Sequence, residues 1–351
     1  MKKSILLLII SFSGYLVSGQ QKEAADRLVN KGVELQDQGA VDSAIALYQK
    51  ALDFDKDNLT ALAEMGYSLQ SIGKNDEAID YCKKALKKHN GDPELKSVYV
   101  TYGNAMDGLK KTEKSIEIYN EGIKQFHDYF KLYFNKGISL NELHKTDEAI
   151  LCFQESVMLN PNHASSHNAL GYLLFHNNKI PSLLAFCRFL ALEPDSKRSI
   201  LDLGNIKKIM TEKVTKTSEN SITINLSPDL LDVKKKQQIN DFSLSELVLA
   251  MSSALDNDSL YKNKPEVENF IRKLEDIFGS LKETKKSNYG FYWDYYVPYF
   301  IEMKDKDLVK TFGYLASSTS EDANVKEWFK SHQNEVDRFF KWSKAFSWSS
   351  N

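Results

Sequence analysis

Glycine recurs through the first 210 residues at a nearly constant spacing, and this period constrains the fold more than any other feature. The glycines lie in the segments VNKGVEL, AEMGYSL, VTYGNAM, FNKGISL, NALGYLL and LDLGNIK. They are Gly32, Gly66, Gly103, Gly137, Gly171 and Gly204, separated by 34, 37, 34, 34 and 33 residues. A period of this length indicates a stack of similar supersecondary units, each packed on its neighbours.

Further positions repeat at fixed distances after the first four glycines. Small residues follow at 12 and at 19 residues, and a ring or a sulfur follows at 16 residues, as Tyr48, Cys82, Tyr119 and Phe153. This pattern is typical of two helices that cross closely, because small side chains let the backbones approach and the larger group fills the remaining gap. The breaker segments DKDN, NGDP, NPNH and EPDS separate the units.

These recurring positions resemble the tetratricopeptide repeat, a helix–turn–helix unit of about 34 residues. The resemblance covers residues 22–210 and implies a solenoid of five repeats plus a capping helix around Gly204. Three departures stand out. The tryptophan common in the first helix is missing, the junction KKHNGDPEL is three residues longer, and the second helix of repeat five, IPSLLAFCRFLALEP, has lost its small positions.

The resemblance also implies that the first helices line a concave groove that binds a protein or peptide partner. Carried onto this sequence, the groove residues are Tyr67, Gln70, Asn104, Phe134, Ile138, Asn141, Asn168, Tyr172 and Phe175. The cations that one subfamily uses to clamp a chaperone-tail carboxylate are replaced by Val100, Ser165 and Ala169, so that partner is excluded. Some of the groove rings could instead pack on the C-terminal region.

The first 19 residues have the layout of a secretory signal peptide. Two lysines precede an apolar run from Ile5 to about Val17, and small residues follow at Ser18 and Gly19. The run is shorter than the roughly 20 residues that span a bilayer, and no later segment approaches that length. The sequence therefore predicts a cleaved signal peptide over residues 1–19, a periplasmic or secreted protein, and association with the cell envelope as an open alternative.

The sequence contains little that indicates chemistry. The net charge of −2 provides no global basic field to recruit nucleic acid. Phosphate loops, dinucleotide fingerprints, nucleophile elbows and zincin motifs are missing from the sequence. The segment HASSH, residues 163–167, lacks the glutamate that a zinc protease needs, and Cys82, Cys152 and Cys187 are expected to be buried thiols, with a Cys152–Cys187 pair left open. We therefore predict no catalytic residue, no cofactor and no metal.

The character of the sequence changes after residue 210. Residues 211–242 are polar and charged and are predicted to be a linker, in which SITINL, residues 221–226, could form a short strand or hairpin. Helical patterns return over residues 243–351, which also hold all four tryptophans. The expected fold is therefore all-α: a tetratricopeptide-like solenoid over residues 22–210, then a linker, then a smaller aromatic-rich helical domain.

The segment FYWDYYVPYF, residues 291–300, has seven aromatic rings in ten positions. As a helix it would carry rings over more than half of its circumference, which favours a buried element that Pro298 bends or restarts. The alternative is a partly exposed face for a ligand or an interface. Its candidate residues are Tyr292, Trp293, Tyr295, Tyr296 and Tyr299.

Three functions follow from these patterns. The first is an exported, non-catalytic scaffold that binds protein partners in its groove. The second is a protein that binds a glycan or small ligand on its C-terminal aromatic rings. The third and weakest is an envelope enzyme, because the only carboxylate pair near the rings, Asp294 and Glu302, would be about 12 Å apart on a helix, too wide for a glycosidase.

Overall fold

The computed structural model describes residues 2–218, 221–225 and 239–348, and its contacts divide the chain into two compact units. The first unit comprises Met1–Glu155 and the second comprises Ser156–Asn351. The division falls within one helix, α8, and so within the region predicted to be a repeat solenoid. Among the described residues the fold is helical apart from one short hairpin, which confirms the predicted fold class.

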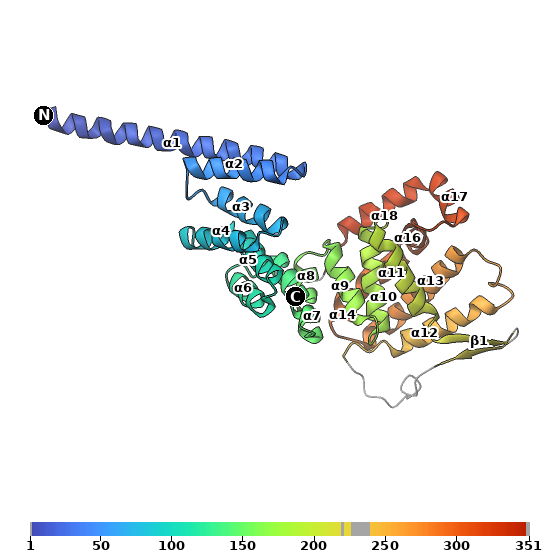
Figure 1. The fold of residues 1–351 in the computed structure, drawn as a ribbon. Coiled ribbons are helices and arrows are strands. Elements are labelled where there is room, and N and C mark those ends of the chain that lie inside the picture. Colours follow the sequence, from blue (N-terminus) through green and yellow to red (C-terminus); the bar gives the residue numbers. More distant parts are fainter. Residues whose placement is uncertain (1, 219–220, 226–238, 349–351) are drawn as a thin grey trace. The chain divides into compact units, whose positions relative to one another are not determined.

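The first unit is a series of helices in which each helix packs against the next (Figure 1). Its helices are α1 (Lys2–Asp37), α2 (Val41–Phe54), α3 (Leu59–Ser71), α4 (Asn75–Lys88), α5 (Leu95–Gly108), α6 (Thr112–Gln125), α7 (Phe130–Glu142) and the start of α8 (Thr146–Leu159). The odd-numbered helices are the predicted first helices of the repeats and the even-numbered ones the second helices.

The repeated glycines are where the paired helices approach most closely. A methyl group added to Gly103 would lie 2.2 Å from the Tyr119 ring, and one added to Gly32 would lie 2.4 Å from the Tyr48 ring. Because real carbon atoms do not approach so closely, only glycine admits these rings. The contacts Gly66–Cys82 and Gly137–Phe153 repeat the pattern, so the predicted 16-residue pairing is confirmed.

The turn between the two helices has a recurring backbone shape in the first four repeats. Seven residues after the repeated glycine, Gly39 and Gly73 have φ angles of 82° and 79°, and Lys110 and His144 have φ angles of 60° and 58°. Such left-handed conformations favour glycine and cost a residue that has a Cβ atom. Repeats three and four therefore make the same turn under backbone strain.

The second unit contains the last repeat helices and all the C-terminal helices. After the end of α8 come α9 (Ala164–Leu174), α10 (Lys179–Leu192), α11 (Lys197–Thr211), α12 (Ser243–Ala254), η2 (Leu255–Asn257), α13 (Glu266–Thr284), η3 (Lys285–Ser287), α14 (Phe291–Tyr295), α15 (Val297–Asp305), α16 (Val309–Ala316), α17 (Ala323–Ser331) and α18 (Gln333–Ala345).

Helix α10 is the centre of this unit, with every residue from Ile180 to Ala191 buried. It contacts α9 and α11 from the repeats and also α12 and α16 from the C-terminal region. The ring of Phe186 fills the gap at Gly171, as in the other repeats. A helix enclosed on all sides is expected to be mainly apolar, and the polar residues of α10 are only Lys179, Ser182 and Arg188.

Two features of the C-terminal region agree with the predictions made from the sequence. The strands β1 (Val214–Ser218) and β2 (Ser221–Ile224) form an antiparallel hairpin in which Val214 pairs with Ile224. The rest of the predicted linker, residues 226–238, lies outside the described residues. In the aromatic segment the helix breaks after Tyr295 and restarts with Pro298 in the first turn of α15, which confirms the predicted restart.

Two glycines of the second unit provide a matched test of the close helix crossing. A methyl group on Gly171 would lie 2.5 Å from the Phe186 ring, whereas one on Gly204 would meet nothing within 4 Å. We expect Gly171→Ala to lower the free energy of unfolding by about 1–3 kcal/mol. Gly204→Ala should raise it by about 0.5–1 kcal/mol, because alanine is the better helix former.

Urea unfolding followed by tryptophan fluorescence is the measurement, because all four tryptophans lie in the second unit. Equal effects of the two alanines would show that the Gly171–Phe186 contact is not a close one.

Candidate partner-binding surface

One position of the first helices is exposed and apolar in three repeats. It directly follows the repeated glycine and holds Tyr67 on α3, Ile138 on α7 and Tyr172 on α9, with exposed fractions of 50%, 42% and 43%. One residue is a rotation of about 100° around a helix. The glycine therefore faces the second helix while its neighbour is turned away from that crossing. All three residues were predicted groove positions.

The remaining predicted residues of the first unit differ in how accessible their side chains are. Asn104 accepts a hydrogen bond of 2.7 Å from the Tyr119 hydroxyl, and the half-buried Phe134 ring lies 5.7 Å from the Phe153 ring. Gln70 is half-buried and Asn141 is exposed. The side chains of Tyr67, Ile138 and Asn141 are therefore the most accessible ones, and Asn104 is held by the repeat's own tyrosine.

In the second unit the predicted residues Asn168 and Tyr172 converge on an acid that the sequence analysis missed. Asn168 donates a hydrogen bond of 2.6 Å to the fully buried Asp202 carboxylate on α11, and the Tyr172 hydroxyl is also bonded to it. Burial raises the pKa of Asp202 to about 6, although these two hydrogen bonds lower it. Its second oxygen, Oδ1, has no hydrogen-bond partner within the described part of the chain.

A sequence signal for this acid was available. Asp202 stands two residues before Gly204, and Glu64 stands two residues before Gly66. Burial also raises the pKa of the Glu64 carboxyl, which accepts a hydrogen bond from Gln36. An acid at this position of a first helix therefore indicates a polar network beside the helix crossing.

The last predicted groove residue, Phe175, lies at the end of α9. The Lys179 ammonium lies 4.9 Å from the centre of its ring, and the Lys208 ammonium lies 6.0 Å away. Both distances suit a cation–π contact, in which the electron-rich face of the ring attracts the positive charge. The ring is half-buried and also contacts Phe186.

The five candidate residues of the aromatic segment do not form an exposed face. The side chains of Tyr292, Trp293, Tyr295, Tyr296 and Tyr299 are each at most 5% exposed. This finding corrects the alternative of an accessible tyrosine surface for a ligand or an interface. The rings are buried because α14 and α15 pack inside the second unit, where their polar tips find protein partners.

Those partners tie the aromatic segment to the last repeat. The Tyr295 hydroxyl donates a hydrogen bond of 2.6 Å to the Val157 carbonyl, and the Tyr296 hydroxyl lies 2.7 Å from His167 Nδ1. The opposite ring nitrogen, Nε2, lies 3.0 Å from the Pro161 carbonyl, which can only accept. Nε2 therefore carries the proton, and Nδ1 accepts from the tyrosine. His167 is thus a packing residue.

Arg188 on α10 is buried among the same rings. Its guanidinium lies 4.9 Å from the centres of both the Tyr299 and Trp348 rings and donates hydrogen bonds to Ser343 and Asn162. No carboxylate pairs with it in the described residues. The ring faces and neutral oxygens therefore stabilise the positive charge. Burying it among them costs less free energy than burying an unpaired cation in an apolar core.

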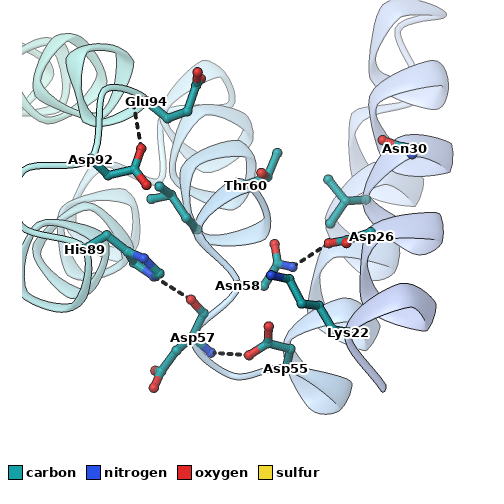
Figure 2. A pocket seen from close by; sticks show the side chains of 12 residues that line it. Lys22, Asp26, Asn30, Asp55, Asp57, Asn58, Thr60, His89, Asp92 and Glu94 are labelled. Atoms are coloured by element: carbon teal, nitrogen blue, oxygen red, sulfur yellow. Dashed lines mark hydrogen bonds between the residues drawn. The ribbon is translucent and has the colours of Figure 1, made fainter. Parts of the chain in front are cut away.

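A separate pocket of about 470 Å³ lies in the first unit, beside the start of α3 (Figure 2). Five carboxylates line it, from Asp26, Asp55, Asp57, Asp92 and Glu94, against the single ammonium of Lys22. Figure 2 shows that Asn58 joins Asp26 and that the His89 ring contacts the Asp57 backbone. Sequence analysis missed this pocket because its residues come from α1, from the loop before α3 with the start of that helix, and from the loop before α5.

The described residues hold neither a metal cluster nor a membrane span. No three histidine, cysteine, aspartate or glutamate side chains among them are placed to hold a metal ion. The three cysteines are free and buried. No helix in the described ranges is long and apolar enough to cross a membrane.

Comparison with known proteins identifies the repeats. The tetratricopeptide repeat family matches residues 35–99 and residues 130–163. A probable UDP-N-acetylglucosamine–peptide N-acetylglucosaminyltransferase, SPINDLY of Hordeum vulgare, is 26% identical over 143 residues, covering 39% of this chain and 15% of the barley protein. Protein O-mannosyl-transferase TMTC1 of Homo sapiens is 29% identical over 182 residues, covering 50% of this chain and 20% of the human protein.

Solved structures give similar matches. TTC0263, a thermophilic TPR protein of Thermus thermophilus, has a TM-score of 0.46 and 16% identity, covering 52% of this chain and 100% of its own. The pilF protein of Pseudomonas aeruginosa has a TM-score of 0.45 and 19% identity, covering 55% of this chain and 91% of its own. The chain thus contains tetratricopeptide repeats, as the sequence predicted, and it spans at most a fifth of the length of these two curated relatives.

The buried histidine gives a prediction about pH. Burial, and after it the positive charge of Arg188, lowers the pKa of His167 well below its usual value. The unfolded chain takes up a proton near pH 6.5, whereas the folded chain does not. The contribution of His167 is therefore complete above pH 6.5 and is lost as the pH falls below it, by up to about 1.4 kcal/mol per pH unit.

The test compares the wild type with His167→Gln by urea unfolding between pH 7 and pH 5. The wild type should lose more free energy of unfolding over this range than the variant. Asp202 acts in the opposite direction, because its raised pKa favours the folded state as the pH falls below about 6. The contribution of Asp202 is the same in both proteins and does not affect the comparison. If the free energy of unfolding depends on pH equally in the two proteins, the buried imidazole of His167 is not neutral.

Proposed function

We propose that this protein is an exported, non-catalytic scaffold that binds extended segments of protein partners on the first-helix faces of its repeats. The observation that carries the proposal is the repeated exposure of an apolar side chain one residue after the repeated glycine, at Tyr67, Ile138 and Tyr172. Singly exposed apolar residues are common on protein surfaces, so the signal lies in their recurrence at one position of the repeat. Tetratricopeptide repeats are helix pairs whose stacking creates extended binding surfaces, which supports the same use.

The chemistry of this surface suits a peptide. Each exposed ring or aliphatic group can cover an apolar side chain of the partner, and each is worth roughly 1–2 kcal/mol when its exposed part is buried. The neighbouring amides of Gln70 and Asn141 supply donors and acceptors for a peptide backbone. The apolar groups would supply most of the affinity, and the amides would fix the position of the peptide backbone along the surface. This combination is expected of peptide recognition.

The non-catalytic part of the proposal rests on the absence of catalytic motifs in the sequence. Two of the curated relatives are named as transferases. The matched segments span 15% and 20% of those proteins, so the similarity does not bring their activities to this chain. The buried C-terminal rings likewise offer no accessible surface for a glycan.

Partner binding can be tested with a matched pair of triple variants. The first replaces Tyr67, Ile138 and Tyr172 by alanine, which removes the exposed apolar group from each first-helix face. We expect it to weaken the binding of co-purified partners, identified by mass spectrometry and then titrated individually, by at least tenfold, since each tenfold loss needs only about 1.4 kcal/mol.

The control triple variant replaces Phe54, Leu151 and Ile200, whose exposed fractions of 49%, 61% and 56% are similar, away from the predicted groove positions. It should retain the partners within about twofold in affinity. Helical circular dichroism must be unchanged in both variants. If the two triple variants bind equally well, partner binding lies elsewhere on the protein.

Export is tested separately, by expression of the full chain in a bacterial host. The apolar run before Gly19 should direct export and cleavage, so that the mature protein begins at Gln20 and is found in the periplasm or medium. Replacement of Leu7 and Leu8 by arginine interrupts the apolar run and should leave the uncleaved protein in the cytoplasm. Mass spectrometry of the N-terminus of each fraction is the measurement. An uncleaved wild-type chain would contradict the proposal.

A further inference from the structure

We infer that the second unit has a binding site for a small oxyanion, a phosphate or a carboxylate joined to an apolar group, in a cavity of about 340 Å³. The cavity lies between the last turn of α11, the 3-10 turn η2, the following loop and the first two turns of α13. Its volume is at the lower end of the roughly 300–1,000 Å³ typical of small-molecule sites, so the ligand is small.

The cavity has an apolar wall and a buried charge. Met210 and Phe270 line it and are themselves 2% and 3% exposed, so a ligand there contacts apolar atoms that are shielded from bulk water. Lys273 also lines it and is only 6% exposed. An ammonium group so deeply buried requires a partner, and Asp256 provides it through an ion pair.

Asp256 is not the partner of Lys273 alone. Its second oxygen accepts a hydrogen bond of 2.6 Å from Arg272, which also lies 3.6 Å from the Asp276 carboxylate. An ammonium group has three N–H donors, and Asp256 is the one partner of the Lys273 ammonium in the described residues. Two donors of a buried cation therefore remain for a ligand oxygen.

Three further lysines surround the cavity. Lys207 comes from α11, and Lys262 and Lys264 come from the loop before α13. Four lining lysines against the two lining acids, Asp256 and Glu266, leave two positive charges in excess. Lysine binds phosphate and carboxylate groups as a point charge, and several lysines on one anion reinforce each other.

The ion pairs on the rim leave these lysines available. Lys207 is 2.7 Å from Glu266, whose side chain is 70% exposed, and Lys264 is 3.5 Å from the exposed Glu268. Exposed pairs of this kind contribute little, so an incoming anion can compete with them. Lys262 has no ion-pair partner in the part of the chain that the structure describes. The excess positive charge is therefore concentrated at the cavity and accessible to an anionic ligand.

This site is distinct from the proposed partner-binding surface. Lys207 stands five residues after Asp202 on α11, a rotation of about 140° around the helix. None of the first-helix residues Tyr67, Ile138 and Tyr172 lines the cavity. Loss of one site should therefore leave the other unchanged, and the two proposals can fail independently.

The experiment uses isothermal titration of the full mature chain with phenyl phosphate, benzoate, inorganic phosphate and phenol at constant ionic strength. Phenyl phosphate joins an oxyanion to an apolar ring and should bind saturably at one site, more tightly than inorganic phosphate or phenol. The comparison with benzoate shows whether the site prefers a phosphate or a carboxylate. A dissociation constant weaker than about 1 mM for every probe would overturn the inference.

A matched pair of double variants tests whether the ligand binds in this cavity. The double variant Lys262→Ala, Lys264→Ala should weaken phenyl phosphate binding at least tenfold while its helical circular dichroism is unchanged, because both side chains are exposed. The control, Lys326→Ala, Lys330→Ala, removes two exposed and ion-paired lysines of α17 and should change the affinity less than twofold. Equal weakening by both pairs would show only general charge attraction and would overturn the site.

Discussion

The complete burial of α10 is the constraint on which the second unit depends. A second helix of a repeat ordinarily has one face against its own first helix and one against the next repeat, and its outer face is polar. In α10 the outer face is apolar as well, and α12 and α16 cover it. The last repeat therefore cannot stand as an ordinary end of a solenoid. It forms one core with the C-terminal helices, which take the place of a capping repeat.

Arg188 shows how specific this shared core is. A guanidinium buried without a carboxylate is tolerated only where ring faces and oxygens are placed around it, and these come from both sides of the core. The tyrosine hydroxyls of α14 and α15 add hydrogen bonds to the His167 ring and the Val157 carbonyl. Burial of apolar surface drives the folding of this core, whereas these polar contacts determine which helices pack against each other. Aromatic residues suit this role because each has a large ring and one polar tip.

Much of this architecture was predictable from the sequence. The glycine period and the ring 16 residues later specify the helix crossings, because only a glycine admits the ring, and these are local relations. The restart at Pro298 follows in the same way from backbone chemistry. The union of α10 with the C-terminal helices was not predicted. It depends on contacts such as His167–Tyr296, which join residues 129 positions apart. The two pockets were missed for the same reason, since each is made by residues from several elements.

A net charge near zero excludes a global field but says nothing about local ones. The total of −2 is made of 46 basic and 48 acidic residues, and these are unevenly placed. The pocket beside α3 has five carboxylates for one ammonium, whereas the cavity beside α13 has two more lysines than acids. Such local surpluses act over about 8–10 Å at physiological salt, which is the scale of a pocket rather than of a protein. The near-zero net charge argues against a long-range electrostatic attraction to nucleic acid. Selective recognition of a small charged group depends on the shorter scale, where the three-dimensional arrangement of the side chains decides.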